Sequence, residues 1–299
     1  MGAALAVVAL IAGAYLVAVL EGWVSTGRLR PAGPLVSAAA LLSRESIVPR
    51  SPDRIFFEVA PPLLLVSAVL AAAVLPLAPG LIVADLATGA LFINAALAYV
   101  MVALLMAGWG PDGAYAMVGG FRFLGQLIGY SMFIVMPITA VAMRAESLLT
   151  TDIVASQAAL ANAVYQPLGL LTFFLAGMMV CFLPPFDLAT ARGEIAGGVE
   201  AEYTGWRLAV FRAGRAVLIV TIATATSVFY FGGWLGPVLP PWAWGGLKAI
   251  AIAAVMLTIG AFVPRIKEEQ LLAACWKVGI PLALFNILLV GIMLLTVGG

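Results

Sequence analysis

The sequence predicts an all-α integral membrane protein that forms a single transmembrane domain over residues 1–299. Of the 299 residues 64% are hydrophobic and only 10% are charged, and the mean hydropathy is +1.13. Soluble proteins carry roughly a quarter charged residues, so this chain lacks the charge to cover a water-exposed surface. Because backbone groups in lipid must be paired within the chain, its long apolar runs are expected to be helical.

The composition also excludes several classes of function. The formal net charge is +1, which gives no electrostatic basis for binding nucleic acid. There is no histidine, which excludes Ser-His-Asp catalysis, haem ligation by histidine and histidine-rich metal sites in this chain. Cys181 and Cys275 are far apart in the sequence, and we interpret them as two buried thiols. We therefore expect the chain alone to bind no metal and no cofactor.

Eight apolar runs are long enough to cross about 30 Å of hydrocarbon, which takes about 20 helical residues. The first run has no basic segment before it, so we interpret it as a retained helix and not as a cleaved signal. The eight expected transmembrane helices cover residues 3–20, 57–77, 88–108, 120–142, 158–183, 208–230, 243–263 and 276–297.

The distribution of lysine and arginine predicts the orientation. Thirteen of these residues lie in or beside the odd-numbered loops, and only two, Arg144 and Lys248, lie in the even-numbered loops. Cytoplasmic loops carry the excess of positive charge. We therefore expect a multi-pass protein of the cell inner (plasma) membrane with both termini on the non-cytoplasmic side.

The first cytoplasmic loop contains a short apolar stretch from Pro34 to Leu42, bounded by Arg30 and Arg44. Arginines that flank such a stretch are well placed in the lipid headgroup layer. The sequence therefore predicts a short amphipathic interfacial helix in this loop.

The third cytoplasmic loop, about residues 184–207, holds the densest acidic cluster of the chain. Like charges among Glu194, Glu200 and Glu202 raise each carboxyl pKa, whereas Arg192 lowers it. Coupled carboxylates of this kind can pass protons near pH 7. A solvated loop with ordinary charges is the alternative, and the pattern leaves both interpretations open.

Other charged residues stand at the ends of the spans. Glu21 closes the first span and Glu58 begins the second, so each is either an interfacial group or a proton-coupling group. Arg122 begins the fourth span, as an anchor or as a partner for a carboxylate. The middles of the spans are almost free of charge, which argues against a substrate transporter.

Several segments resemble one family. Residues 185–188 (PFDL), Glu194 and residues 202–205 (EYTG) resemble the "PFDL…E…EYSG" loop of the H subunit (subunit 1) of respiratory complex I. Further segments resemble motifs of the same subunit, in the same order and at similar spacing. They are residues 107–109 with 115–122, residues 152–157 and residues 232–237 (GGWLGP). Residues 264–282 contain four further matching pairs: PR, QL, WK and PL. The wider family includes the matching subunit of energy-converting hydrogenases and of formate hydrogenlyase.

The sequence departs from the family pattern at several acidic positions. Residues 180–183 replace the family's Glu-Thr-Asn-Arg, and Thr190 and Arg192 stand where two glutamates usually follow "PFDL". Residues 129–131 replace a "SYE" segment.

The resemblance implies a membrane heel subunit with eight transmembrane helices in a proton-translocating oxidoreductase that takes electrons from NADH or another donor to quinone. An energy-converting hydrogenase or formate hydrogenlyase-like complex is the alternative, and a stand-alone transporter is a third. No activity is expected of the chain alone. Quinone would bind at an interface with partner subunits, which hold the iron–sulfur clusters.

The resemblance and the charge pattern together assign residues to roles. The proton-coupling and quinone-chamber candidates are Asp187, Arg192, Glu194, Glu200, Glu202, Tyr203, Glu58 and Glu21. The partner-docking candidates are Arg28, Arg30, Arg44, Arg122, Arg265 and Lys267. The expected partners are soluble iron–sulfur and quinone-site subunits on the cytoplasmic face, small membrane and antiporter-like subunits at the sides, and lipid.

Overall fold

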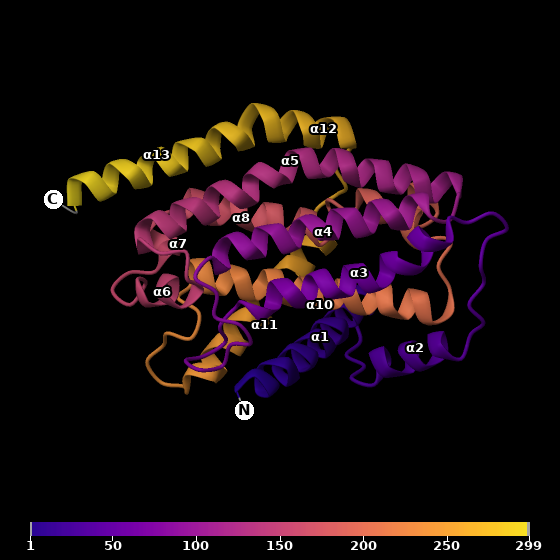
Figure 1. Cartoon of the computed structure of the whole chain (residues 1–299), viewed down its shortest axis with the longest axis horizontal. Helices are drawn as coiled ribbons and strands as arrows, with labels where there is room; N and C mark the ends of the chain where they lie inside the picture. Colours follow the sequence, from indigo (N-terminus) through magenta and orange to yellow (C-terminus); the bar gives the residue numbers. More distant parts are fainter. Residues whose placement is uncertain (1, 298–299) are drawn as a thin grey trace.

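The structure is a computed structural model that describes residues 2–297, and this part of the chain is a bundle of long helices (Figure 1). Seven helical segments of the described chain are long and apolar enough to cross a membrane. They are α1 (Gly2–Thr26), α3 (Arg54–Ala73), α4 (Gly89–Trp109), α5 (Ala114–Ala145), α10 (Gly205–Tyr230), α11 (Pro241–Phe262) and Glu268–Thr296. The last segment comprises α12 (Glu268–Ala274), a π-helical turn (Cys275–Gly279) and most of α13 (Ile280–Val297). The all-α membrane class is therefore confirmed.

The fifth predicted span, over residues 158–183, is wrong as one continuous helix. Its place is taken by the single turn α7 (Asn162–Tyr165) and by α8 (Pro167–Val180), which has 14 residues. A helix of that length covers about 21 Å, less than the hydrocarbon core of about 30 Å. Pro167 causes the break, because it disfavours the helical conformation at Gln166, whose φ and ψ are −138° and 70°. The predicted count of eight spanning helices is not confirmed.

Several helices extend beyond the apolar runs that predicted them. Helix α1 continues to Thr26 and α5 begins at Ala114, each about six residues outside the expected span. The extra turns of α1 hold Glu21, and the extra turns of α5 place Arg122 two turns inside that helix and not at its start. A hydropathy pattern marks only the residues that lie in the apolar membrane core. The backbone hydrogen bonds of each helix continue beyond those residues, so the pattern misses the outer turns. The charged groups are therefore held on rigid helices.

Helix α10 is the centre of the bundle. Every residue from Val217 to Tyr230 is buried, as expected for a helix that is apolar on all sides. It packs against α3 on one side and against α11 and α1 on another, while α4 and α5 extend the bundle beyond α3. The hydroxyls of Thr221, Thr224 and Thr226 donate to the carbonyls four residues earlier, so these polar groups are satisfied within the helix.

The π-helical turn before α13 (Cys275–Gly279) lies at a close approach to α5. A side chain at Gly279 would overlap the ring of Phe133 on α5, so only glycine allows this approach. Helix α13 lies along α5 at the side of the bundle (Figure 1). The extra residue of a π-turn shifts the helix surface while keeping the helix continuous.

The two ends of the bundle differ in charge. Helix α2 (Gly33–Leu42) and α12 lie toward one end, away from the C-terminus of α13 (Figure 1). We call this the charged end, because all five ion pairs among the described residues lie there. Helix α2 forms where the amphipathic helix was predicted, and Leu35, Val36 and Leu42 on it are exposed. Its place at a membrane interface stays a prediction.

Candidate functional site

Residues 181–204 at the charged end fold as a compact cap and not as a solvated loop. The cap contains α9 (Arg192–Ile195) and two 3-10 turns, Leu188–Thr190 and Gly198–Glu200. Side chains of the cap, including Phe186 and Val199, are buried in the main core. The cap backbone lies directly on α5, where a side chain at Gly119 would meet Ala189 O at 2.6 Å. The acidic residues of this segment are therefore placed by tertiary packing.

A cavity of about 290 Å³ lies between this cap and the ends of three long helices. We call it the charged cleft. Its lining includes three carboxylates and three arginines that come from distant parts of the sequence. These are Glu21 on α1, Asp187, Arg192 and Glu200 in the cap, Arg215 on α10, and Arg265 after α11.

The ion pairs of the charged cleft differ in closeness. Arg265 Nη2 lies 2.6 Å from Asp187 Oδ2, and Arg215 Nη1 lies 3.3 Å from Glu21 Oε1. Arg192 Nη2 is 3.7 Å from Glu200 Oε2. Because the Arg192 side chain is 72% exposed, water screens this pair and it contributes little to stability. Glu200 is nevertheless almost buried.

Two buried atoms of the charged cleft lack a hydrogen-bond partner within residues 2–297. They are Asp187 Oδ1, an acceptor, and Arg215 Nε, a donor. Leaving such a group unsatisfied costs about 1–3 kcal/mol, and more when it is charged. A guest that both donates and accepts hydrogen bonds would satisfy the two atoms together.

Burial raises the pKa of the Asp187 carboxyl, against the opposing effects of Arg265 and Arg215. The nearby Glu194 raises the same pKa further. Asp187 therefore holds its proton to a higher pH than an exposed aspartate does. A carboxyl with a raised pKa inside a cleft is a group suited to taking up or releasing a proton.

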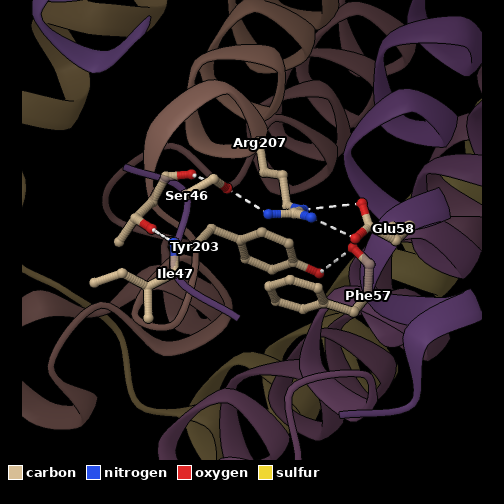
Figure 2. Close-up of polar contacts among 7 residues, drawn as sticks. Ser46, Ile47, Phe57, Glu58, Tyr203 and Arg207 are labelled. Carbon is tan, nitrogen blue, oxygen red and sulfur yellow. Dashed lines mark hydrogen bonds and ion pairs between the residues drawn. The ribbon is translucent and has the colours of Figure 1, made fainter. Parts of the chain in front are cut away.

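Arg207, which stands eight residues before Arg215 on α10, is buried in a separate cluster (Figure 2). Arg207 on α10 donates from Nε to Glu58 Oε2 on α3 at 2.9 Å, from Nη2 to Glu58 Oε1, and from Nη1 to Ser46 Oγ. Its guanidinium also lies over the rings of Phe57 and Trp206, at 5.1 and 5.0 Å. We call these residues, with Tyr203 and Thr204, the Arg207 cluster.

Tyr203 and Thr204 join this cluster to the segment that follows α2. The Tyr203 ring stacks on Phe57 at 4.7 Å, and its hydroxyl donates to Phe57 O at 3.3 Å. Ile47 N donates to Thr204 Oγ1 at 2.8 Å. Burial raises the pKa of the Tyr203 phenol, which stays protonated. The cluster therefore ties the first loop, α3 and α10 together at one point.

Other predicted site residues lie outside the charged cleft. Glu194 pairs with Arg122 at 2.7 Å, and its side chain is 52% exposed. Glu202 lies over Gly113 at the start of α5, where a Cβ on that glycine would meet Glu202 Oε1 at 2.9 Å. Four docking candidates outside the charged cleft are exposed: Arg28, Arg30, Arg44 and Lys267.

Sequence reasoning counted Arg215 only as one of many positive charges. The structure places it inside the charged cleft, opposite Asp187, with a side chain that is 15% exposed. One signal was present in the sequence, since Arg215 is the eighth residue of the predicted span that begins at 208. An ionisable residue within a span is by default a functional candidate.

The fold and the site together define a polytopic α-helical membrane protein with a charged, capped end. Residues 4–291 match the family model described as NADH dehydrogenase. The chain therefore belongs to the NADH dehydrogenase family, which is the H subunit (subunit 1) family of respiratory complex I. The resemblance read from the sequence motifs is confirmed. The chain is a membrane subunit of a multi-subunit oxidoreductase of the complex I type.

Proposed function

We propose that this chain is the membrane heel subunit of a proton-translocating oxidoreductase that reduces quinone, and that the charged cleft forms part of its quinone chamber. The observation that carries this proposal is the pair of unpartnered atoms, Arg215 Nε and Asp187 Oδ1, in one cleft. A quinone carbonyl accepts a hydrogen bond from the Arg215 Nε–H. A quinol hydroxyl donates to the Asp187 carboxylate. The same two residues therefore suit both states of the substrate.

Partner subunits supply the redox chemistry. Two electrons from a partner's iron–sulfur cluster and two protons convert quinone to quinol. Arg28, Arg30, Arg44 and Lys267 are exposed at the charged end and offer positive charge to the soluble subunits. The charged end faces the cytoplasm in this proposal, in agreement with its excess of arginine. Antiporter-like and small membrane subunits pack at the sides of the bundle.

Proton coupling follows from electrostatics. Electron transfer to quinone creates negative charge beside the charged cleft, and that charge raises the pKa of neighbouring carboxyls. Asp187 responds first, because burial already raises its pKa. Protonation of Asp187 weakens its hold on Arg265, and Arg215 then shifts toward Glu21. The redox step and the rearrangement of the ion pairs are thereby linked.

The competing function is the equivalent subunit of a hydrogenase-type complex, in which protons or ferredoxin replace quinone. Such a complex needs no binding site for a neutral guest beside the membrane helices. The paired donor and acceptor of the charged cleft, set between α1, α10 and α11, favour quinone.

The test is Asp187→Asn in membranes that contain the intact complex. We expect quinone-dependent electron transfer to fall about tenfold, because one hydrogen bond to a charged group is worth about 1.5–3 kcal/mol and 1.4 kcal/mol is a factor of ten. Asp85→Asn is the matched control, since Asp85 is exposed in the loop between α3 and α4. An unchanged rate in Asp187→Asn would remove the charged cleft from the chamber. Hydrogen evolution without quinone reduction in wild-type membranes would favour the hydrogenase-type function.

A further inference from the structure

Helix α3 contains two consecutive prolines, Pro61 and Pro62. A proline has no backbone N–H, so the carbonyl four residues earlier in a helix loses its usual hydrogen bond. For Pro61 this carbonyl belongs to Phe57, and for Pro62 it belongs to Glu58. Phe57 is completely buried in the main core, away from water. Its free carbonyl therefore needs a donor from another part of the chain.

Tyr203, near the end of the cap, supplies this donor (Figure 2). Its hydroxyl donates to Phe57 O at 3.3 Å. The Tyr203 ring is itself buried, and it stacks on the Phe57 ring at 4.7 Å and on the Phe211 ring of α10 at 6.1 Å. These two ring contacts fix the direction of the hydroxyl, which thus meets the carbonyl that Pro61 leaves free.

The backbone of Tyr203 connects this contact to the charged cleft. Tyr203 N donates to Glu200 O at 3.2 Å, directly after the 3-10 turn that carries Glu200. Glu200 lines the charged cleft, and the residue is buried. The hydroxyl that reaches α3 and the carboxylate that lines the cleft are therefore only three residues apart, at the same end of the cap.

We propose that Tyr203 is a positioning residue, whose hydroxyl replaces the hydrogen bond that Pro61 removes from α3 and thereby holds the Glu200 end of the cap in place. This role differs from the proton-coupling role that the sequence suggested for Tyr203, because it requires the phenol to keep its proton. It concerns the attachment of the cap to α3 and needs no quinone, so it stands apart from the proposed function.

The first variant is Tyr203→Phe, which keeps both ring contacts and removes only the hydroxyl. Hydrogen exchange of the cap amides, residues 187–202, is measured by mass spectrometry in the intact purified complex. We expect these amides to exchange about fivefold faster than in the wild type, because opening of the cap no longer breaks this hydrogen bond. Unchanged exchange in Tyr203→Phe would by itself overturn the inference.

The two prolines provide a matched pair of backgrounds that separates this role from general packing. Pro61→Ala restores an N–H that bonds to Phe57 O within α3, so the hydroxyl of Tyr203 is no longer required. Pro62→Ala restores the N–H that faces Glu58 O, whereas the Tyr203 hydroxyl donates to Phe57 O.

We expect Tyr203→Phe to have almost no effect on cap exchange in the Pro61→Ala background, and to keep its effect of about fivefold in the Pro62→Ala background. An equal effect of Tyr203→Phe in the two backgrounds would show that the hydroxyl does not act through the carbonyl freed by Pro61, and would overturn the inference. If Pro61→Ala does not assemble, the result of Tyr203→Phe in the otherwise wild-type complex still decides whether the hydroxyl holds the cap.

Discussion

The charged end contains two arginines on the same helix, one buried and one mostly buried, whose surroundings differ. The side chains of Arg207 and Arg215 are 9% and 15% exposed, so both are removed from water to a similar degree. Arg207 donates from three of its nitrogens, to Glu58 and Ser46, and its guanidinium lies over the rings of Phe57 and Trp206. Arg215 also lies over an aromatic ring, that of Phe182 at 5.2 Å, but it has only one looser ion pair, with Glu21, and its Nε is left without a partner in the described part of the chain.

This difference separates a structural ion pair from a binding site. A buried charge whose hydrogen bonds are all made has nothing left to offer a guest, and it holds its neighbours in one arrangement. A buried charged group that lacks one hydrogen-bond partner and lies beside a cavity can still form a hydrogen bond with a guest. The missing hydrogen bond lowers the stability of the protein. The Arg207 cluster therefore fixes the first loop against α3 and α10, whereas the charged cleft remains available.

The largest effect is expected from Arg207→Gln. Breaking one partner of a buried, hydrogen-bonded pair costs about 3–5 kcal/mol, and the lower end applies here because Glu58 is 42% exposed. Thermal unfolding of the purified complex, with limited proteolysis of the segment 43–53, measures the loss and the release of this loop. Arg212→Gln, an exposed position on the same helix, should leave both measurements unchanged. Equal behaviour of the two variants would contradict a structural role for Arg207.

Arg215→Gln should show the opposite balance of effects. Arg215 has one ion pair, at 3.3 Å to the half-exposed Glu21, where Arg207 makes three side-chain hydrogen bonds, so the change in unfolding free energy should stay within about 1 kcal/mol. Quinone-dependent electron transfer should fall about tenfold, because the cationic Nε–H group that donates to the quinone carbonyl is lost. Equal destabilisation by Arg215→Gln and Arg207→Gln, with electron transfer unchanged in Arg215→Gln, would contradict the assignment of Arg215 to a binding site.

The smallest effect is a pH dependence of stability. The folded-state pKa of Asp187 is raised, chiefly by burial. Its contribution is therefore complete below the ordinary aspartate range and is lost as pH rises through the folded-state pKa. We expect the Tm of the wild type to fall relative to that of Asp187→Asn as pH rises from about 4 toward neutrality. A Tm difference that does not change with pH, or that changes in favour of the wild type, would contradict the raised pKa.

Hydropathy and charge predicted most of the helices and the side of the bundle where charges gather. Seven of the eight expected spans overlap long apolar helices, because both the pattern and the helix respond to the same hydrocarbon thickness. The fifth span failed because composition ignores the local effect of Pro167 on the residue before it. The helix at 33–42 was found because its flanking arginines and apolar centre are both local signals.

The candidate site was predicted in part. The motifs around residues 185–188 and 202–205 located the cap, and Asp187 and Glu200 lie in the cleft beside it. Glu194 and Glu202 belong to the same acidic run but point elsewhere, because the folded cap turns at Gly197 and Gly198, both with positive φ. A linear pattern treats neighbouring acids as one group, whereas the turns of the backbone separate them.

The sequence by itself determined that this protein is a helical membrane subunit, which end of it is charged, and to which family it belongs, because hydropathy, charge and motifs are properties of short stretches. Only the tertiary structure decided which carboxylate meets which arginine. Arg215 and Asp187 are 28 positions apart, and Glu21 is further still. Their meeting in one cleft depends on how α1, α10, α11 and the cap pack together, and side-chain shape and burial control that packing.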